Sequence, residues 1–435
     1  MIKRYLPIIT LTYWIVAGLF AIRVPDWQTP DEPAHYHYIA QIAETGKIPV
    51  IEAGDWNQSY LDELKSSQFD AAYMNDFSTI QYEDHQPPLY YLLAAPVYSL
   101  TDGSLTALRL FSVAIGTLIV WSACGIGAVM FPQRPWIGLG AAAFVAFQPM
   151  HIHILASVNN DALGWAMVGI LLYGAIAYVK SIPLFGREIK AWHLGIFMGI
   201  AFITKATAFF MAGVIPLAIL LHWWASDERK AADLIKRWAA FLIPALIFGI
   251  AWAIRNFDVY GFPDFMGLAA HDSVVIGQPR TAELIDRLGF GGYLREILSV
   301  TYNSFWGRWG WMALPMERKW ELLIGASVII ALIGAIVDTF RRERPSKEQR
   351  NAWMILVSVT LLSILAYLYY NSEFQQHQGR YMFTLLIPLG IWLALGVDAW
   401  RQFVPRLTPL VVPGVFFAFA VFDVYMLWRV IVPNL

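Results

Sequence analysis

The sequence contains one cysteine, few charged residues and almost no net charge, and each shortage excludes a class of protein. Cys124 cannot form an intramolecular disulfide, and its place in an apolar run indicates a small buried side chain. Charged residues make up 14% of the chain and hydrophobic residues 58%, whereas soluble globular chains carry roughly 25% and 45–50%. This composition excludes a soluble enzyme. The formal net charge of −1 excludes a general nucleic-acid-binding surface, so no nucleic acid is expected as a partner.

Several familiar catalytic signatures are also missing. The sequence has no glycine-rich phosphate loop, no zinc-ligand spacing, no serine nucleophile elbow and no repeat with a period of 20–50 residues. It also shows no separate soluble terminal domain, so we expect residues 1–435 to form a single integral membrane domain. Any chemistry must then come from the polar loops and from the helix ends beside them.

Apolar runs of about 20 residues, the length that crosses a bilayer core, dominate the sequence. The first run, 5–24, follows a basic start but has no A-x-A-like cleavage site after it, so it predicts a retained transmembrane helix rather than a signal peptide. The pattern predicts an all-α polytopic bundle of about eleven transmembrane helices. The other ten runs cover residues 106–131, 136–157, 162–180, 192–204, 206–225, 238–255, 320–340, 352–370, 381–398 and 408–431. The run 192–204 is short for a full crossing.

The positively charged short loops predict the orientation of the bundle. Every alternate connection carries at least one Lys or Arg, which places the N-terminus inside and the two long polar stretches, 25–87 and 256–318, outside. This assignment requires that the proline-containing segment 87–101 does not cross, and we expect a half-inserted or interfacial helix there. The expected inner basic residues are Lys3, Arg4, Arg134, Lys180, Arg187, Lys190, Arg229, Lys230, Lys236, Arg237, Arg341, Arg342, Arg344, Lys347, Arg350, Arg401 and Arg406.

Two adjacent carboxylates, Asp31 and Glu32, follow the first predicted helix and are bracketed by prolines. A helical pattern begins at Ala34, so both acids lie at a helix N-terminus close to the membrane surface. Helix capping accounts for them, because acidic residues are favoured in the first turn. Catalysis by a carboxylate is the alternative.

Two further polar motifs interrupt the pattern where apolar sequence resumes. His85 precedes a Pro-Pro turn, where it could bind a phosphate or a metal, or simply form a surface turn. Asp161 follows two asparagines between two apolar runs, where a turn stabilised by its own side chains is the alternative to a functional site.

Three cations are also predicted on the outer side of the membrane. Lys205 interrupts apolar sequence, and ionisable residues at membrane depth usually face a site or a partner, although snorkelling to the interface would also explain it. Arg380, at the start of a late helix, presents a planar fork of donors suited to a phosphate, with interfacial anchoring as the alternative. Arg308 lies in an aromatic segment of the second long stretch, which is more typical of an interface than of a catalytic site.

All of these residues fall on the outer side under the predicted topology. This shared placement is stronger evidence for a functional site than any one motif. Acids beside cations at a membrane surface suit the transfer of a group from a lipid-linked phosphate. A carboxylate can deprotonate an acceptor hydroxyl, and cations can stabilise the departing phosphate. We therefore expect these side chains, distant in the sequence, to converge in one pocket.

The order of these motifs resembles that of the GT-C membrane glycosyltransferases, and in particular the group with protein O-mannosyltransferases and aminoarabinose lipid A transferases. The similar features extend over about residues 5–400. They are Asp31-Glu32 with His35 after the first helix, Pro-Pro-Leu-Tyr-Tyr at 87–91, Asn160-Asp161 opening a helix, Gly199–Lys205, and Gln378-Gly379-Arg380-Tyr381.

The resemblance implies an inverting transferase whose donor is a polyprenyl-phosphate-linked sugar. It implies that Asp31 is the general base, with Glu32 as its catalytic neighbour and Asp161 as the second-loop acid. It also implies that Lys205, His85 and Arg380 contact the donor phosphate, and we group Arg308 and Tyr381 with these substrate-binding residues. No cofactor is certain. Some relatives need a divalent metal, for which Asp31, Glu32, His35 and Asp161 are the candidate ligands.

The expected protein is therefore a multi-pass glycosyltransferase of the bacterial inner membrane, in contact with membrane lipids and acting at the outer face on an unknown acceptor. A lipid or polysaccharide transporter is an alternative, although the sequence shows no inverted repeat. An inactive assembly subunit with the same fold is a third possibility.

Overall fold

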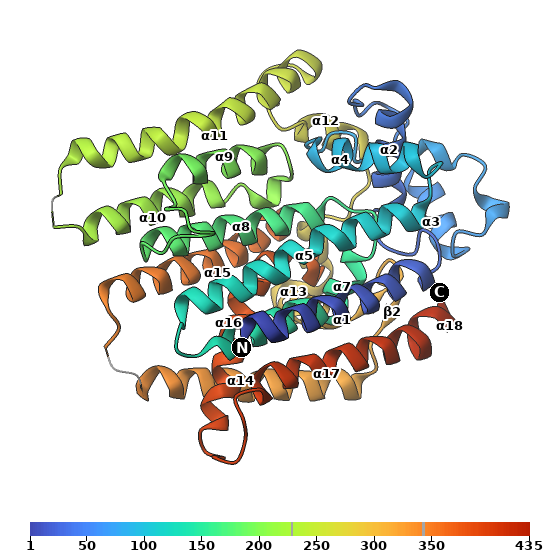
Figure 1. Ribbon diagram of the computed structural model, residues 1–435. Coiled ribbons are helices and arrows are strands. Elements are labelled where there is room, and N and C mark those ends of the chain that lie inside the picture. Colours follow the sequence, from blue (N-terminus) through green and yellow to red (C-terminus); the bar gives the residue numbers. More distant parts are fainter. Residues whose placement is uncertain (228, 342–343) are drawn as a thin grey trace.

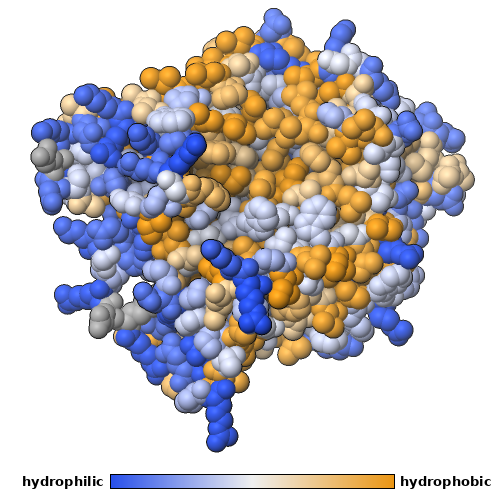
Figure 2. All heavy atoms as spheres, viewed as in Figure 1, coloured by the Kyte–Doolittle hydropathy of each residue, from blue (hydrophilic) through white to orange (hydrophobic). Residues whose placement is uncertain are grey.

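The computed structural model describes residues 1–227, 229–341 and 344–435, so Arg342 of the expected basic loop lies outside the described residues. The described chain is a bundle of long helices that run side by side, with shorter helices gathered at one end (Figure 1). Hydrophobic residues cover the middle of the face shown in Figure 2, and hydrophilic residues gather at its left and right margins. The predicted all-α polytopic fold is confirmed.

Within the described residues, nine helical segments are long and apolar enough to cross a membrane. They are α1 (Ile2–Arg23), α5 (Leu105–Met130), α8 (Asp161–Val179), η3 with α10 (Ala206–Ala208, Met211–Ala225), α11 (Ala231–Tyr260), α14 (Arg318–Arg341), α15 (Lys347–Glu373), η4 with α16 (Gly379–Leu385, Leu386–Arg401), and α17 (Val411–Met426) continued by η5 (Leu427–Ile431) and α18 (Val432–Asn434).

Two predicted crossings differ from regular helices. The run 136–157 is a bent pair, α6 (Pro135–Phe147) and α7 (Pro149–Leu155), with an angle of 64° between them. Pro149 explains the break, because proline cannot donate the backbone hydrogen bond that a continuous helix needs. The run 192–204 forms the 12-residue helix α9 (Ala191–Phe202), which spans about 18 Å and is short for a bilayer core.

The segment 87–101 forms the short helix that the sequence predicts. Helix α4 (Leu89–Leu100) has 12 residues, too few to cross a bilayer. Its N-terminus meets the end of α9, because the Leu89 N–H donates to the Ile203 carbonyl over 2.9 Å. The two short helices therefore meet at the same end of the bundle.

The two long polar stretches each contain several helices, and parts of both pack together at this end (Figure 1). The first contains α2 (Glu32–Thr45), α3 (Gln58–Ser66), η1 (Ala71–Tyr73) and η2 (Phe77–Thr79). The second contains α12 (Leu268–Val274), α13 (Thr281–Trp306) with a kink at Gly289, and a two-stranded hairpin of β1 (Arg308–Trp309) and β2 (Leu314–Pro315). A small apolar core that includes Leu64, Ile80 and Val275 joins the two stretches.

The opposite end of the bundle holds the predicted basic loops. Lys180 Nζ, after α8, donates to Gln349 at the start of α15 over 2.5 Å. Arg134, before α6, pairs with Asp398 near the end of α16 and, over 3.2 Å, with Asp338 near the end of α14. These contacts place alternate loops together, as the charge pattern predicts.

Candidate functional site

Asp31 and Arg380 form an ion pair between residues 349 positions apart in the sequence. Asp31 is the N-cap residue of α2 and has φ = 68°, a left-handed backbone conformation that costs a non-glycine residue free energy and is enriched at functional sites. The Tyr82 hydroxyl donates to Asp31 Oδ1 over 2.9 Å, and Arg380 Nε donates to Gln378 over 2.8 Å. The carboxylate is therefore held from both sides in one orientation.

These contacts also set the ionisation of Asp31. Burial favours the neutral carboxyl, but the positive charge of Arg380 and the hydrogen bonds from Arg380 and Tyr82 outweigh it and hold the pKa of Asp31 below its ordinary value. Asp31 is therefore a carboxylate throughout the neutral pH range.

A second ion pair joins Lys205 to Asp161. Lys205 lies at the break between α9 and η3, and its Nζ is 2.7 Å from Asp161 Oδ1 at the first residue of α8. The same ammonium donates to Asn160 Oδ1. Only 13% of the Lys205 side chain and 6% of the Asp161 side chain are exposed, so this charge faces protein rather than lipid or water.

His35 and Glu83 connect the two ion pairs electrostatically. His35 is buried, and its Nδ1 is 2.8 Å from the Tyr91 hydroxyl. Burial, together with the positive charge of Lys205, lowers the pKa of His35 to about 3. Because the charges of Lys205, Asp31 and Arg380 all act on this ring, the two pairs belong to one site.

Glu83 is a further buried acid of the site, and it was not predicted from the sequence. Among the described residues, its buried Oε2 has no hydrogen-bond partner. Burial and the negative charge of Asp31 raise the pKa of Glu83 to about 7, although Lys205 and Arg380 lie close enough to oppose this rise. Around neutral pH, Glu83 can therefore donate a hydrogen bond or carry a charge.

His85 lies beside this cluster. Its Nδ1 is 3.2 Å from the Tyr82 carbonyl, and its ring centroid is 4.4 Å from that of His271 in α12. Burial and the neighbouring His271 hold the pKa of His85 well below its ordinary value, so the ring is neutral. Because a carbonyl oxygen only accepts, the single N–H of the neutral ring is Nδ1–H, and Nε2 is an acceptor 3.3 Å from Gln86 Nε2. His85 can donate to a phosphate only by giving up its contact with Tyr82.

Glu32 faces away from the Asp31 pair and contacts Arg109 in α5. Arg109 Nε and Nη2 donate to the two Glu32 oxygens over 2.8 and 2.6 Å, and both side chains are 1% exposed or less. The Val158 N–H donates to the same carboxylate over 3.1 Å. Arg109 also donates to the carbonyls of Ala21, Val24 and Pro25 at the end of α1. This pair fastens the end of α1 and the start of α2 to α5.

Two of the predicted substrate-binding residues have contrasting positions. Tyr381 lies beside the first ion pair: the Arg380 guanidinium stacks over its ring at 5.1 Å, and its hydroxyl is 3.5 Å from Arg380 Nη2. Arg308 Nε donates to the Met312 carbonyl within the β1–β2 hairpin over 2.7 Å. The structure thus brings Asp31, Asp161, Lys205, Arg380, Tyr381, His35 and His85 to one region, and places Glu32 and Arg308 in other contacts.

The described residues include no group of three or more His, Cys, Asp or Glu side chains placed to hold a metal ion. The four candidate ligands are instead engaged in the ion pairs and hydrogen bonds described above. A metal at this site would have to displace Arg380 or Lys205 from its carboxylate.

Four residues of the site and its supports were not predicted from the sequence: Tyr82, Glu83, Asn160 and Arg109. Arg109 carried a readable signal, because an arginine within the apolar run 106–131 needs a buried partner. Nothing local distinguishes Tyr82 or Glu83 from the other tyrosines and acids of the first long stretch.

The arrangement offers two cations, each paired with an acid (Asp31 or Asp161), and one further carboxyl, Glu83, that changes charge near neutral pH, in a largely buried setting. Such a set can bind a phosphate through the cations and accept a proton from a hydroxyl through the carboxylate.

Comparisons with known proteins place the chain in a family. No curated protein matches the sequence. The fold is similar to two crystal structures of ArnT from Cupriavidus metallidurans. The structure of ArnT bound to undecaprenyl phosphate is 15% identical, with 98% of this chain and 72% of that chain covered and a TM-score of 0.47. The apo structure is 13% identical, with 93% and 81% covered and a TM-score of 0.42. Residues 62–389 match the family described as "Predicted membrane protein (DUF2142)", and the chain therefore belongs to the DUF2142 family of membrane proteins.

Proposed function

We propose that the protein is a membrane glycosyltransferase that moves a sugar from a polyprenyl-phosphate donor to an acceptor hydroxyl, with inversion at the anomeric carbon. The observation that carries the proposal is the convergence of the Asp31–Arg380 and Lys205–Asp161 pairs around His35 and Glu83. Two cations and an oriented carboxylate are the groups that this reaction needs, and the motif order resembles GT-C enzymes.

In the proposed reaction, Asp31 accepts the proton of the acceptor hydroxyl as its oxygen attacks the anomeric carbon. The bond between that carbon and the phosphate oxygen breaks, and its electron pair leaves with the polyprenyl phosphate. Arg380 and Lys205 stabilise the charge on the leaving phosphate. Tyr82 and the strained backbone at Asp31 hold the carboxylate in place before substrate binds.

Both cations are paired with carboxylates in this structure, so the donor phosphate has to compete with those carboxylates. The donor phosphate must replace Asp31 on Arg380 and Asp161 on Lys205, at least in part. The exchange releases the Asp31 carboxylate from its guanidinium partner, which raises its basicity at the moment when it is needed. Donor binding would thereby prepare the base.

The remaining residues take supporting roles in this proposal. Glu32 acts as a positioning residue, since its pair with Arg109 fixes the start of α2 and therefore Asp31. Tyr381 packs against Arg380. The neutral His85 ring would donate to the substrate phosphate only after its Nδ1–H leaves the Tyr82 carbonyl. Arg308 would reach substrate only by leaving its contact with Met312.

The proposed location is the outer face of the bacterial inner membrane. The basic loops lie at the end of the bundle opposite to the site, and such loops are retained on the cytoplasmic side. Polyprenyl-linked sugars and bulk lipids would reach the site from the membrane.

The test is a cleavage assay on the purified full-length protein with radiolabelled polyprenyl-phosphate sugars and membrane extract as acceptor. Acceptor-dependent release of polyprenyl phosphate is expected. Movement of the intact lipid across a proteoliposome membrane without cleavage would instead support the transporter. Binding of the lipid with neither cleavage nor transport would support the inactive subunit.

We predict that the KM for the donor rises above about pH 7. Below its pKa of about 7, Glu83 is neutral and can donate a hydrogen bond to the phosphate; above it, the ionised carboxylate repels the donor. The increase should approach about tenfold per pH unit, because one ionisation is involved. Steady-state kinetics between about pH 6 and 9 measure it.

Glu83→Gln provides the matched control, since the amide keeps the shape and cannot ionise. Its KM should stay flat over this pH range and resemble the low-pH value of the unmodified protein. An unchanged pH profile in the variant would assign the ionisation to another group.

A further inference from the structure

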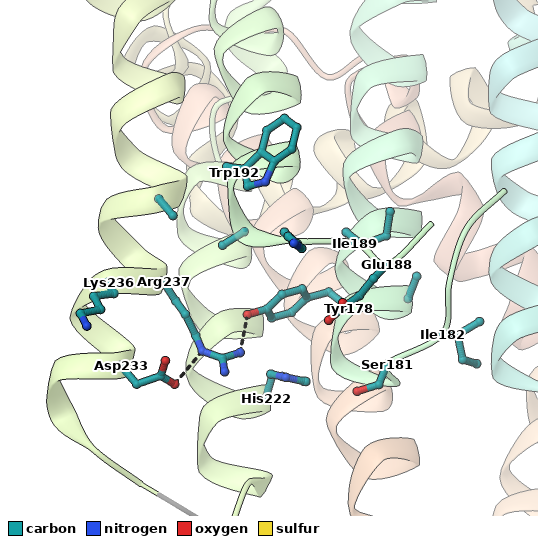
Figure 3. Close-up of a pocket in the computed structure, with 14 residues that line it drawn as sticks. Tyr178, Ser181, Ile182, Glu188, Ile189, Trp192, His222, Asp233, Lys236 and Arg237 are labelled. Atoms are coloured by element: carbon teal, nitrogen blue, oxygen red, sulfur yellow. Dashed lines mark hydrogen bonds and ion pairs between the residues drawn. The ribbon is translucent and has the colours of Figure 1, made fainter. Parts of the chain in front are cut away.

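A cavity of about 350 Å³ lined by several charged side chains lies at the end of the bundle opposite to the candidate site. It is formed by the end of α8, the loop that leads into α9, the end of α10 and the start of α11 (Figure 3). This volume is within the range of small-ligand pockets. None of the residues proposed for glycosyl transfer lines it.

Arg237 occupies the centre of this cavity (Figure 3). Its Nε donates to Asp233 over 2.8 Å, and its Nη1 donates to the Tyr178 hydroxyl over 3.1 Å. A guanidinium carries five N–H groups, so these two bonds orient the fork and leave donors for a further acceptor. Planar, oriented guanidinium groups are well suited to phosphate.

The charge around Arg237 favours an anion. Lys190 and Lys236 also line the cavity, whereas Glu188 and Asp233 are its acids. Asp233 is already neutralised by its ion pair with Arg237. In the described part of the chain, no ion pair within 4.0 Å engages Lys190, so its charge is available to a ligand.

The cavity also lies where lipid headgroups meet water. Trp192 at its rim is 44% exposed, and Trp224 nearby on α10 is 62% exposed. Exposed tryptophans at the ends of transmembrane helices are typical of the membrane interface. The surrounding loops are the basic ones, and basic pockets between helices on the cytoplasmic side bind anionic lipid headgroups.

The geometry points to a second binding site, in which Arg237 and Lys190 hold the phosphate of an anionic glycerophospholipid headgroup at the basic end of the bundle. Trp192 would pack against the glycerol region, and the acyl chains would run along α9 and α11. A soluble phosphate compound presents the same phosphate group as a lipid headgroup, so the experiment distinguishes these two ligands.

The test uses native mass spectrometry of the full-length protein with phosphatidylglycerol, with phosphatidylcholine and with inorganic phosphate. Retained phosphatidylglycerol identifies a lipid headgroup, and retained inorganic phosphate identifies a soluble phosphate ligand; either supports a phosphate site. Retention of phosphatidylcholine alone, or of none of the three, would overturn the proposal.

Two variants locate the site. Arg237→Gln and Lys190→Ala should each weaken phosphatidylglycerol binding roughly fivefold or more, as expected for one lost cation near the surface. Lys190 contacts His193 through its backbone N–H, which the substitution leaves in place, so this variant remains informative if Arg237→Gln misfolds. Arg344→Ala is the matched control, an exposed arginine beyond α14 at the same end.

Glu188→Gln gives a prediction of opposite sign. Glu188 lines the cavity and repels an anion, so its neutral amide should strengthen phosphatidylglycerol binding. Equal weakening by Lys190→Ala and Arg344→Ala, or weaker binding by Glu188→Gln, would show that general surface charge rather than this cavity binds the lipid.

Discussion

Replacing Asp31 by Asn is expected to lower sugar transfer about 10²- to 10⁴-fold, the range for losing a general base, while polyprenyl phosphate still binds. Tyr82 and Arg380 donate to different oxygens of Asp31. The oxygen of the introduced amide can still accept from Arg380 while its NH₂ donates to the Tyr82 hydroxyl, so α2 keeps its start. It cannot accept a proton. Without a negative charge it competes less strongly with the lipid phosphate for Arg380, so product affinity should stay equal or increase.

Single-turnover cleavage of the labelled donor and equilibrium binding of polyprenyl phosphate measure these two effects separately. Asp62→Asn is the matched control, because Asp62 is an exposed acid of the same polar stretch with 56% of its side chain accessible. Transfer at the normal rate by Asp31→Asn would rule out Asp31 as the base. Loss of both transfer and lipid binding would show that its role is structural.

The second large effect is expected on stability. Glu32→Gln should lower the free energy of unfolding by about 3–5 kcal/mol, because it leaves Arg109 charged, buried and without its counter-charge. The thermal transition of the protein in detergent or nanodiscs measures this loss. Activity should fall as well, since α2 would no longer hold Asp31 opposite Arg380.

A double variant separates the charge effect from packing. Glu32→Gln combined with Arg109→Met removes both charges and should recover part of the lost stability. Recovery should be incomplete, because Arg109 also donates to the carbonyls at the end of α1. Glu63→Gln, at an exposed acid of α3, is the control. Equal transitions for Glu32→Gln and Glu63→Gln would contradict the structural role of the pair.

The sequence predicted the bundle well because helix length and loop charge are local properties. Hydropathy alone located the long helices, and the alternation of basic loops correctly grouped the loops that share an end. It treated 136–157 as one regular crossing, although Pro149 breaks that run. It also counted 192–204 as a crossing. In the structure this run forms α9, which has only 12 residues and ends against the start of α4.

The site was only partly accessible from sequence, because partners depend on tertiary contacts. Asp31, Lys205 and Arg380 stood out as charges beside apolar sequence, and the structure brings them to one region. The adjacent acids Asp31 and Glu32 looked equivalent, yet successive residues at a helix start point in different directions. One therefore meets Arg380 and the other meets Arg109.

A structure of the full-length protein with polyprenyl phosphate bound would test the proposed phosphate site directly. We expect a phosphate within hydrogen-bonding distance of Arg380 and of Lys205 Nζ, with Asp31 and Asp161 displaced from them. A phosphate bound away from both cations, with both ion pairs intact at saturating lipid, would contradict it.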